Sequence, residues 1–442
     1  MNKIKLFFGA CVASVLCTMN ATAQLTLGTE IRPRGEVRAG YKDLYKSGEN
    51  PAEIFTQRTR LNVGFKTEKI KTYFSFQNVS IWGEQSKNTN TNRTATSADT
   101  SSLTNICEGW AELNLCKYSA LRVGRQLLAI EDERLLSSGN WGQAGQSLDG
   151  VLYHFDNDSI VKIRVFASYN NEKDSRVSST MISNKFNPKL KTFNFIELKK
   201  DVNKNLNFTL LGILSAALKT GATDKMYPKN TFGAYVTLKN DDIAVSGSGF
   251  YQNGQNSDGK LNRAFLVNAQ IKYTKKLFEV IVGVDLLSGN DMTKTDADYK
   301  KINHKCDVLL GTTRPFQGTM ELVNTKTSDA GLFTPFFKSK TKITENVSVG
   351  ANYFFLKTQN NVGYTDGTGT YVKLNKYLGQ EGDLLISYKI NSDVTLDLGY
   401  TYLYASHSLK VLKKAENAFD GQNWAWVQLT FKPKLFEGAL KN

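Results

Sequence analysis

Apolar and polar residues alternate with a two-residue period in the stretch LTLGTEIRPRGEVRAGY, residues 25–41. The odd positions carry apolar, small or neutral side chains. The even positions carry five charges in a row, namely Glu30, Arg32, Arg34, Glu36 and Arg38. Because successive side chains of a β-strand point to opposite faces, this pattern predicts a strand with one apolar face and one charged face.

The same pattern recurs along the chain. Stretches rich in β-branched and aromatic residues predict further strands at 121–125, 161–169, 206–214, 265–273, 347–355, 394–404 and 424–431. After the first twenty-odd residues, no segment approaches the 18 continuous apolar residues of a membrane-spanning helix, so a helical membrane protein is excluded. The chain is therefore expected to be all-β.

The connections between these stretches alternate between short and long. Eight short turns fall near residues 67, 116, 156, 200, 239, 274, 344 and 390. Nine longer polar segments lie at roughly 42–54, 83–104, 131–146, 171–191, 219–229, 254–261, 288–329, 358–375 and 407–421. Nine long and eight short connections join eighteen strands. An even strand number, short periplasmic turns and long external loops are typical of outer-membrane β-barrels.

We therefore expect a transmembrane antiparallel β-barrel of about 18 strands, with both termini in the periplasm. Its apolar strand faces would contact lipid and its charged faces would line the lumen. Residues 308–323 could be read as a nineteenth strand. Because the expected number is even, we place them in the loop 288–329, either beyond the membrane or folded into the barrel. Aromatic girdles at the membrane interfaces are expected from Tyr400, Tyr402, Tyr404, Trp424 and Trp426.

The first 23 residues have the features of a secretory signal peptide. A basic start, MNKIK, precedes the apolar run LFFGACVASVLCTM and an Ala21-Thr22-Ala23 cleavage site. Residues 24–442 are then expected to form one barrel domain in the outer membrane of a Gram-negative cell. The three remaining cysteines are Cys107, Cys116 and Cys306, an odd number that argues against a disulfide framework. A Cys107–Cys116 bridge stays open beside the simpler interpretation as small apolar strand residues.

The charge balance indicates anionic partners. The formal net charge of +15 becomes +13 when Lys3 and Lys5 are removed with the signal peptide. A strong positive balance attracts anions, and an exported protein is not expected to bind nucleic acid. Expected partners are small anionic or sugar-like solutes, outer-membrane lipid and lipopolysaccharide. Lysine-rich loops bound to lipopolysaccharide would account for part of the charge without any transport.

Charged side chains recur on the predicted lumen face. The arginines in this phase are Arg32, Arg34, Arg38, Arg58, Arg60, Arg122 and Arg164, and the carboxylates include Glu108, Glu112 and Asp397. The guanidinium fork binds carboxylates and phosphates through two hydrogen bonds, and rings of arginine favour anions. Any single arginine could instead pair across strands and fill the wall. As a set they favour an electropositive channel, because arginines outnumber carboxylates in the first two strands.

The segment EDERLLSSGNWGQAG, residues 131–145, combines three acids, Arg134 and Trp141 in one external connection. It could fold inward and narrow the pore, or pack on the barrel rim. Catalysis is not expected, because His154, His304 and His407 lack metal-site spacing and nothing marks a nucleophile. No phosphate-binding loop is present and no cofactor is expected. The alternative function is a non-conducting structural or adhesive barrel plugged by the loop 288–329.

Several stretches together resemble the alginate-export family of outer-membrane barrels. They are QRTRLNVGF (57–65), SIWGE (80–84), EGWAEL (108–113), LRVGRQ (121–126), DERLLSSGNW (132–141), SLDGV (147–151) and YLGQEGDLLISY (377–388). The resemblance implies an eighteen-stranded barrel with an electropositive lumen that passes an anionic polysaccharide.

The resemblance also implies roles for individual residues. Arg58, Arg60, Arg125 and Arg134 would be constriction arginines, with Glu112 and Asp383 as their carboxylate partners. Alternation from Leu121 places Arg125 on the lipid side, and a bulge after Gly124 would re-aim it. Asn78 and Ser80 stand where the family pattern leads us to expect an acid and a base. We therefore expect a porin for anionic or sugar-acid solutes rather than for alginate itself.

Overall fold

The computed structural model describes residues 23–83, 103–171, 190–218 and 225–440. Apart from Ala23, the expected signal peptide lies outside these residues, as do most of the expected loops at 83–104 and 171–191 and part of that at 219–229. No helix in the described part of the chain is both long and apolar enough to cross a membrane.

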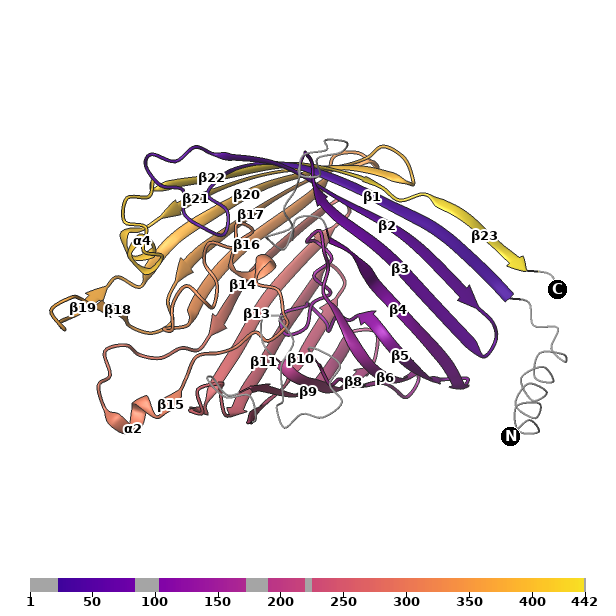
Figure 1. Cartoon of the computed structure of the whole chain (residues 1–442), viewed down its shortest axis with the longest axis horizontal. Helices are drawn as coiled ribbons and strands as arrows, with labels where there is room; N and C mark the ends of the chain where they lie inside the picture. The colour runs from indigo at the N-terminus through magenta and orange to yellow at the C-terminus, as the bar shows by residue number, and fades with distance from the viewer. Residues whose placement is uncertain (1–22, 84–102, 172–189, 219–224, 441–442) are drawn as a thin grey trace, which may run out of the picture.

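Eighteen antiparallel strands form a closed barrel (Figure 1). They are β1 (Ala23–Ala39), β2 (Ala52–Lys66), β3 (Ile70–Ile81), β4 (Leu103–Cys116), β5 (Ser119–Leu127), β6 (Ser147–Asn157), β7 (Val161–Ala167), β8 (Leu190–Asp201), β9 (Leu206–Leu218), β10 (Met226–Asn240), β11 (Ile243–Gly254), β13 (Ala264–Lys275), β14 (Phe278–Leu287), β16 (Leu332–Lys342), β17 (Val347–Lys357), β20 (Tyr377–Lys389), β21 (Val394–Ala405) and β22 (Gly421–Phe431). Each strand pairs with its neighbours along the chain, and β22 pairs with β1. The predicted all-β barrel of about 18 strands is confirmed.

Short elements occupy the connections and the C-terminus. They are β12 (Leu261–Asn262), α2 (Ala297–Lys300), β15 (Ile302–Asn303), α3 (Arg314–Gln317), β18 (Val362–Thr365), β19 (Tyr371–Leu374), α4 (His407–Leu412) and β23 (Lys434–Leu440). The strand β23 continues the course of β22 and pairs with the first residues of β1. It is hydrogen-bonded into the barrel sheet, but it is not a nineteenth strand of the closed wall.

Strand β1 follows the alternation that its sequence predicts. Of the charged side chains at its even positions, Glu30, Arg32, Arg34 and Glu36 are buried on the lumen side and Arg38 is half-buried there. By contrast, Ile31 and Val37 are exposed on the outer face. Similar alternation in the other strands leaves an apolar outer wall, because lipid is the solvent on that side. The outer face therefore suits a bilayer and the inner face holds the polar residues.

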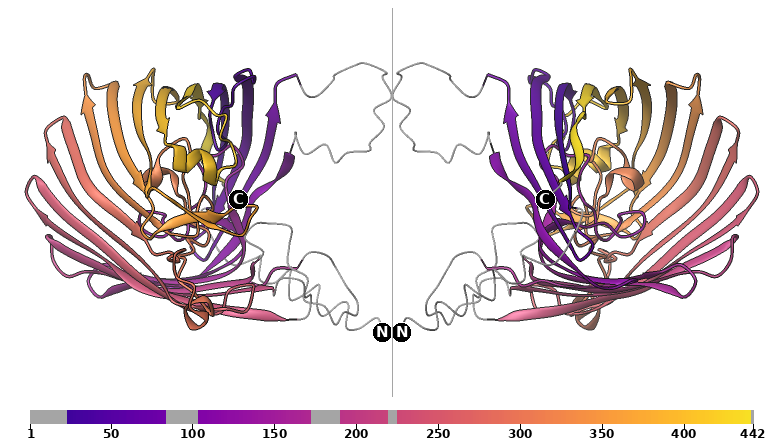
Figure 2. Two further views of the ribbon diagram at one scale, coloured as in Figure 1. Left: turned by 90° about the vertical axis from the view of Figure 1, so that its left-hand side faces the viewer. Right: turned by 90° about the vertical axis from the view of Figure 1, so that its right-hand side faces the viewer.

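Two long connections fold into the barrel (Figure 2). We call residues 128–146, between β5 and β6, loop A, and residues 288–331, between β14 and β16, loop B. Fully buried side chains of both loops form an apolar core with inward side chains of the wall: Ile130, Leu135, Leu136, Met320, Leu322, Phe166, Phe193, Leu266 and Phe354. The sequence left two positions open for residues 308–323 and for residues 131–145, inside the barrel or outside it. In the structure both segments lie inside the barrel.

The two loops also bind each other through their backbones. Leu310 N donates to Leu135 O at 3.2 Å, and Ser137 N donates to Leu310 O at 3.0 Å. Thr312 N donates to Glu133 O at 2.9 Å. Gly311 lies within this contact, where a Cβ atom would overlap the carbonyl group of Arg134. Loops A and B thus form one unit across the lumen.

Two of the expected girdle residues face the other way. Tyr400, Tyr402 and Tyr404 are exposed on the outer wall, as a girdle requires. Trp424 is fully buried and Trp426 packs beside it on the lumen side, so their assignment to a girdle is wrong. The reason is their phase, since both share the face of β22 that carries the buried Gln422 and Gln428. The three described cysteines are free, so the possible Cys107–Cys116 bridge is absent.

Candidate functional site

Four predicted lumen arginines lie side by side on the first two strands. Arg32 faces Arg58 in the β1–β2 register, and Arg60 faces Glu30 two pairs further along, on the same face of the sheet. We call Arg32, Arg34, Arg58 and Arg60 the arginine cradle. Each of the four residues is at most 6% exposed. All four point into the barrel as predicted, yet none is open to solution.

Loop A covers the arginine cradle and supplies its hydrogen-bond acceptors. Arg32 donates to Asn140 O at 3.0 Å and to Gly142 O at 2.6 Å. Arg58 donates to the same two carbonyl oxygens at 3.1 and 3.2 Å. Backbone carbonyl groups carry only partial charges, so they satisfy the guanidinium donors without cancelling their charge. The cradle therefore fixes loop A and leaves a positive field in the lumen.

One carboxylate lies inside the cradle. Glu30 forms a buried ion pair with Arg58. Arg34 donates to the side-chain oxygen of Gln428 at 2.6 Å, which links β1 to the closing strand β22. With one carboxylate among four guanidinium groups, the cradle has a net positive charge.

Aromatic rings surround Trp141 at the tip of loop A. The guanidinium groups of Arg34 and Arg314 lie 3.9 and 3.6 Å from the centre of the Trp141 ring system. Trp424 and Trp426 meet the same ring edge-on at 5.9 and 6.0 Å. Cations over aromatic faces are stabilising, and such faces also accept sugar or aromatic rings. We call Tyr41, Trp141, Trp424 and Trp426 the aromatic cluster.

Arg38 is the arginine of β1 that keeps an open fork. Its Nε donates to Glu36 at 2.9 Å, but neither Nη atom has a hydrogen-bond partner among the described residues. Its side chain is 27% exposed, and its guanidinium lies 4.7 Å from the centre of the Tyr41 ring. Two free donors beside an aromatic ring are suited to a carboxylate attached to a ring. Arg38 is therefore the predicted residue best placed to contact a solute.

A second group of charges lies nearer the short turns, around Glu112. This buried carboxylate accepts hydrogen bonds from Lys71 and Arg122, both at 2.7 Å, and His154 Nε2 lies 3.2 Å away. Arg122 stacks 3.9 Å from the ring of Trp110 and keeps 23% of its side chain exposed. The two cations, Lys71 and Arg122, outnumber the one carboxylate, so this part of the lumen is positive as well.

Arg134 and Arg164 hold the loops to the wall. Arg134, almost fully buried, forms an ion pair with Asp285 of β14 and stacks 3.9 Å from the ring of Phe316 in loop B. Arg164 pairs with Glu197 and donates to Ala129 O of loop A at 3.0 Å. Both side chains serve the contact between loops and wall in this structure.

Asp383 contacts no arginine among the residues that the structure describes, although the resemblance implied that it would. Its carboxylate accepts hydrogen bonds from Thr319 at 2.8 Å, Thr401 at 2.9 Å and Asn352 at 3.1 Å. The adjacent inward acid, Glu381, accepts from the backbone N–H groups of Thr319 and Met320. These two acids fasten loop B to the wall.

Arg125 lies on the outer face of the barrel, so the lumen position implied by the resemblance is not found. It forms a bidentate ion pair with Asp149 at 2.8 and 2.7 Å, and both side chains are largely exposed. The ladders through Gly124 and Arg125 are regular on both sides, so no bulge re-aims the side chain. Strand alternation alone predicts the outward position of Arg125.

Tyr41, Trp424, Trp426 and Arg314 were not identified from the sequence as site residues, whereas Trp141 was noted in the segment 131–145 that could narrow the pore. The alternation in QNWAWVQL shows that Trp424 and Trp426 share a face with two glutamines, which is a lumen signal. Arg314 offers no comparable signal, because it begins the one-turn helix α3 inside loop B, where no strand alternation marks a lumen face. Its position follows from tertiary contacts with Trp141 and with Tyr41, to whose hydroxyl it donates at 3.1 Å.

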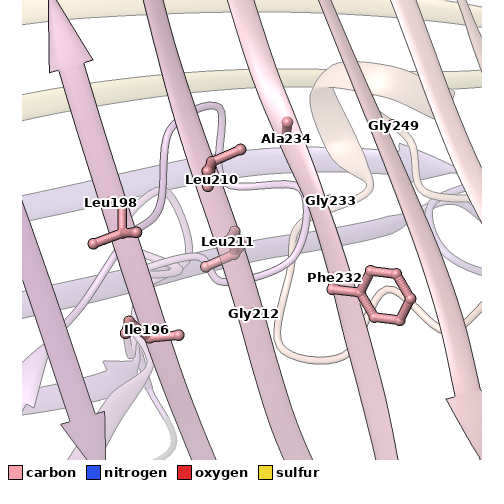
Figure 3. Close-up of a pocket in the computed structure, with 9 residues that line it drawn as sticks. All are labelled: Ile196, Leu198, Leu210, Leu211, Gly212, Phe232, Gly233, Ala234 and Gly249. Carbon is pink, nitrogen blue, oxygen red and sulfur yellow. The ribbon is translucent and has the colours of Figure 1, made fainter.

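A depression of about 560 Å³ lies on the outer wall instead (Figure 3). Its lining is apolar, and Ile196, Leu210 and Phe232 are exposed on the outer face around Gly212 and Gly249. An apolar hollow at this position faces lipid and contains no group that could recognise a solute. It is therefore not part of the candidate site.

Solved outer-membrane proteins have a similar fold. The outer membrane protein OpdK from Pseudomonas aeruginosa is 10% identical, with a TM-score of 0.59 over 93% of this chain and 98% of that chain. OccAB1 from Acinetobacter baumannii is 12% identical, with a TM-score of 0.61 over 93% and 97%. OccK2 (OpdF) from P. aeruginosa, solved in complex with glucuronate, is 11% identical, with a TM-score of 0.60 over 94% and 97%.

A further structure of OpdK was solved with vanillate and is 11% identical, with a TM-score of 0.57 over 92% of this chain and 98% of that chain. No protein-family model and no curated protein matches the sequence. Membership of the alginate-export family therefore stays an expectation from the sequence. At these identities the likeness shows the fold alone, which is that of eighteen-stranded outer-membrane channels.

Proposed function

We propose that this protein is an outer-membrane channel for the passive diffusion of small anionic or sugar-acid solutes. The observation that carries the proposal is the open fork of Arg38 beside Tyr41, above a cradle of four buried arginines. The cradle supplies a positive field, and Arg38 supplies donors that a carboxylate can reach. Solved channels of similar fold hold vanillate and glucuronate, which are ring-bearing acids of this kind.

Charge selection would arise at two levels of the lumen. Arg38 lies at the end of β1 that leads into the long connections, and Arg122 lies near the short turns. Basic groups at both levels lower the energy of an anion along its path, while their exposure keeps each contact weak enough for release. Loops A and B narrow the lumen between the level of Arg38 and the level of Arg122. No step of this process requires catalysis or a cofactor.

Planar-bilayer recording of the purified mature chain tests the proposal. Folding is first verified by heat-modifiable mobility on a gel. Reversal potentials in a KCl gradient should show anion selectivity, and added glucuronate should reduce the current more than glucose does. Cation selectivity would contradict the solute class.

A second candidate function is a non-conducting structural or adhesive barrel. It is favoured by the apolar core that loops A and B build inside the lumen, including the fully buried Leu135 and Met320. The same recording separates the two functions. Folded protein that gives no conductance steps would support the plugged barrel.

A further inference from the structure

Loop B is fastened to the wall by two carboxyl groups that share one hydroxyl. Glu381 and Asp383 lie on the inner face of β20 and are 1% and 5% exposed. The hydroxyl oxygen of Thr319 lies 3.3 Å from Glu381 Oε1 and 2.8 Å from Asp383 Oδ1. The two carboxyl groups are also within hydrogen-bonding reach of each other. They therefore occupy one buried hydrogen-bonding site.

The partners of this pair are neutral. Glu381 Oε1 accepts from the backbone N–H groups of Thr319 and Met320, and Asp383 accepts from Thr401 and Asn352. Within the described part of the chain, neither acid forms an ion pair. Neutral donors can satisfy one buried carboxylate, whereas two carboxylates in contact repel each other and are costly to bury.

The second oxygen of Glu381 has no donor. Its Oε2 is buried and has no hydrogen-bond partner among the described residues. It lies against Gly318 of loop B, where a Cβ atom would be only 2.5 Å away. Buried acceptors without a donor are rare, and a protonated carboxyl group supplies an O–H of its own. Two carboxyl groups in contact without a donor between them thus indicate a proton on one of them.

The strands on either side of β20 present no charge to the pair. In register with Glu381 are Phe354 and Leu403, and in register with Asp383 are Asn352 and Thr401. The charged groups that face the pair come from β14, β16 and the two loops. They are Asp285, Lys338, Asp132, Arg134, Arg314 and Glu321.

These charges balance when the pair carries one negative charge. Arg134 forms ion pairs with Asp285 and with the partly exposed Asp132, and Arg314 pairs with Glu321. Lys338 is left to oppose the pair, and it also donates to Pro315 O of loop B. One ammonium group offsets one carboxylate. A second ionisation of the pair would therefore add a buried charge that no neighbouring cation offsets.

We propose that Glu381 and Asp383 share one proton, and that this proton makes their contact with Thr319 and Met320 a pH-sensitive latch for loop B. Loss of the proton as the pH rises would leave two carboxylates in contact, and their repulsion would loosen loop B from β20. Loop A is bonded to loop B at Leu310, so both loops would move. The latch does not depend on the channel function; only its effect on conductance rests on the proposed function.

A spin label on loop B tests the latch without any measurement of conductance. A nitroxide is attached at Lys326→Cys, an exposed position of loop B that follows Met320. The labelled chain also carries Cys116→Ser, because Cys116 is the exposed native cysteine. Labelling is carried out at pH 7, and folding is verified by heat-modifiable gel mobility. The spectrum of the purified mature chain should show a more mobile label at pH 10 than at pH 7.

Three variants identify the source of this response. Glu381→Gln can still donate a hydrogen bond to Asp383 but cannot ionise, so the label should stay immobile at both pH values. Asp383→Asn removes the like charge and should also lose the response. The matched control is Asp397→Asn, which removes an inward acid of the neighbouring strand β21 and should keep the response.

The outcomes separate the latch from the channel. Equal label mobility at both pH values in the parent would overturn the proposal. A response that persists in Glu381→Gln would also overturn it, because Lys338 or another group would then be its source. The conductance of the parent should rise at pH 10, and that of Glu381→Gln should not. The expected label response in a barrel that never conducts would support the latch and contradict the proposed channel function.

Discussion

Arg58 donates a hydrogen bond from Nη1 to the carbonyl oxygen of Asn140 at 3.1 Å, and so ties the wall to the tip of loop A. The Arg58→Ala variant would lose this anchor and leave the buried Glu30 without its partner. Removing one member of a buried ion pair costs about 3–5 kcal/mol. We expect a lower urea midpoint, together with a larger and noisier single-channel conductance as loop A loosens. Unchanged noise would show that loop A is held by other contacts.

Arg38→Gln tests direct contact with the solute. A hydrogen bond between charged groups contributes about 1.5–3 kcal/mol, so the glucuronate concentration that blocks half the current should rise about 10- to 150-fold. Anion selectivity in a KCl gradient should fall. Stability should also fall, because the buried Glu36 loses its ion pair with Arg38 and keeps only the hydrogen bond from the indole of Trp424. Lys373→Gln, on the exposed strand β19, removes the same charge away from the lumen and should leave the block unchanged.

Gly311→Ala tests the contact between the two loops. A Cβ atom at this position would overlap the backbone carbonyl of Arg134, which neither loop can move cheaply. Overpacking of this kind costs about 1–3 kcal/mol. We expect faster proteolysis within loops A and B and a lower unfolding temperature. Gly367→Ala is the matched control, because a Cβ atom there has no neighbour within 4 Å.

Asp307 gives the fold a pH dependence. Burial alone would raise the pKa of this loop carboxyl, but the ammonium of Lys229 and the backbone N–H of Leu309 hold the pKa below its ordinary value. A group with a lowered folded-state pKa stabilises the protein above its unfolded-state pKa of about 3.9, and that contribution is lost as the pH falls through the folded-state pKa.

The Asp307→Asn variant should therefore be less stable than the parent at pH 7 and nearly equal to it well below pH 4. The pair is partly exposed to solvent, so we expect a difference of about 1 kcal/mol or less. Urea unfolding at both pH values measures it. Glu345→Gln, at an exposed turn position, serves as the control for loss of one carboxylate. An equal difference at both pH values would mean that the carboxylate charge of Asp307 is not responsible.

Strand phase could be predicted from the sequence, because it depends on local alternation. Arg32 and Arg58 point inward as expected, and Arg125 points outward as its own phase required. The resemblance misplaced Arg125, since it carried over a role without testing the register. The same phase rule, applied to β22, would have placed Trp424 and Trp426 in the lumen.

The cover over the arginine cradle could not be predicted. Arg32 and Asn140 are 108 positions apart, and their contact exists because loop A happens to fold inward. Whether a polar loop folds inward or outward depends on tertiary contacts such as the one between Leu136 and Leu310, which leave no periodic signal. Those contacts determine the exposed fraction of each arginine side chain, and hence whether a solute can reach it.

The closure of the barrel has a consequence for how the protein is assembled. The indole of Trp424 in β22 donates to Glu36 of β1 at 3.0 Å and packs against Trp141 of loop A. This three-way contact joins the start of the chain, its second quarter and its end. The surface that the tip of loop A contacts is therefore complete only when β22 has paired with β1. A nascent chain that lacks its final strands would therefore have an unpaired edge on β1 and an incomplete packing surface for the tip of loop A.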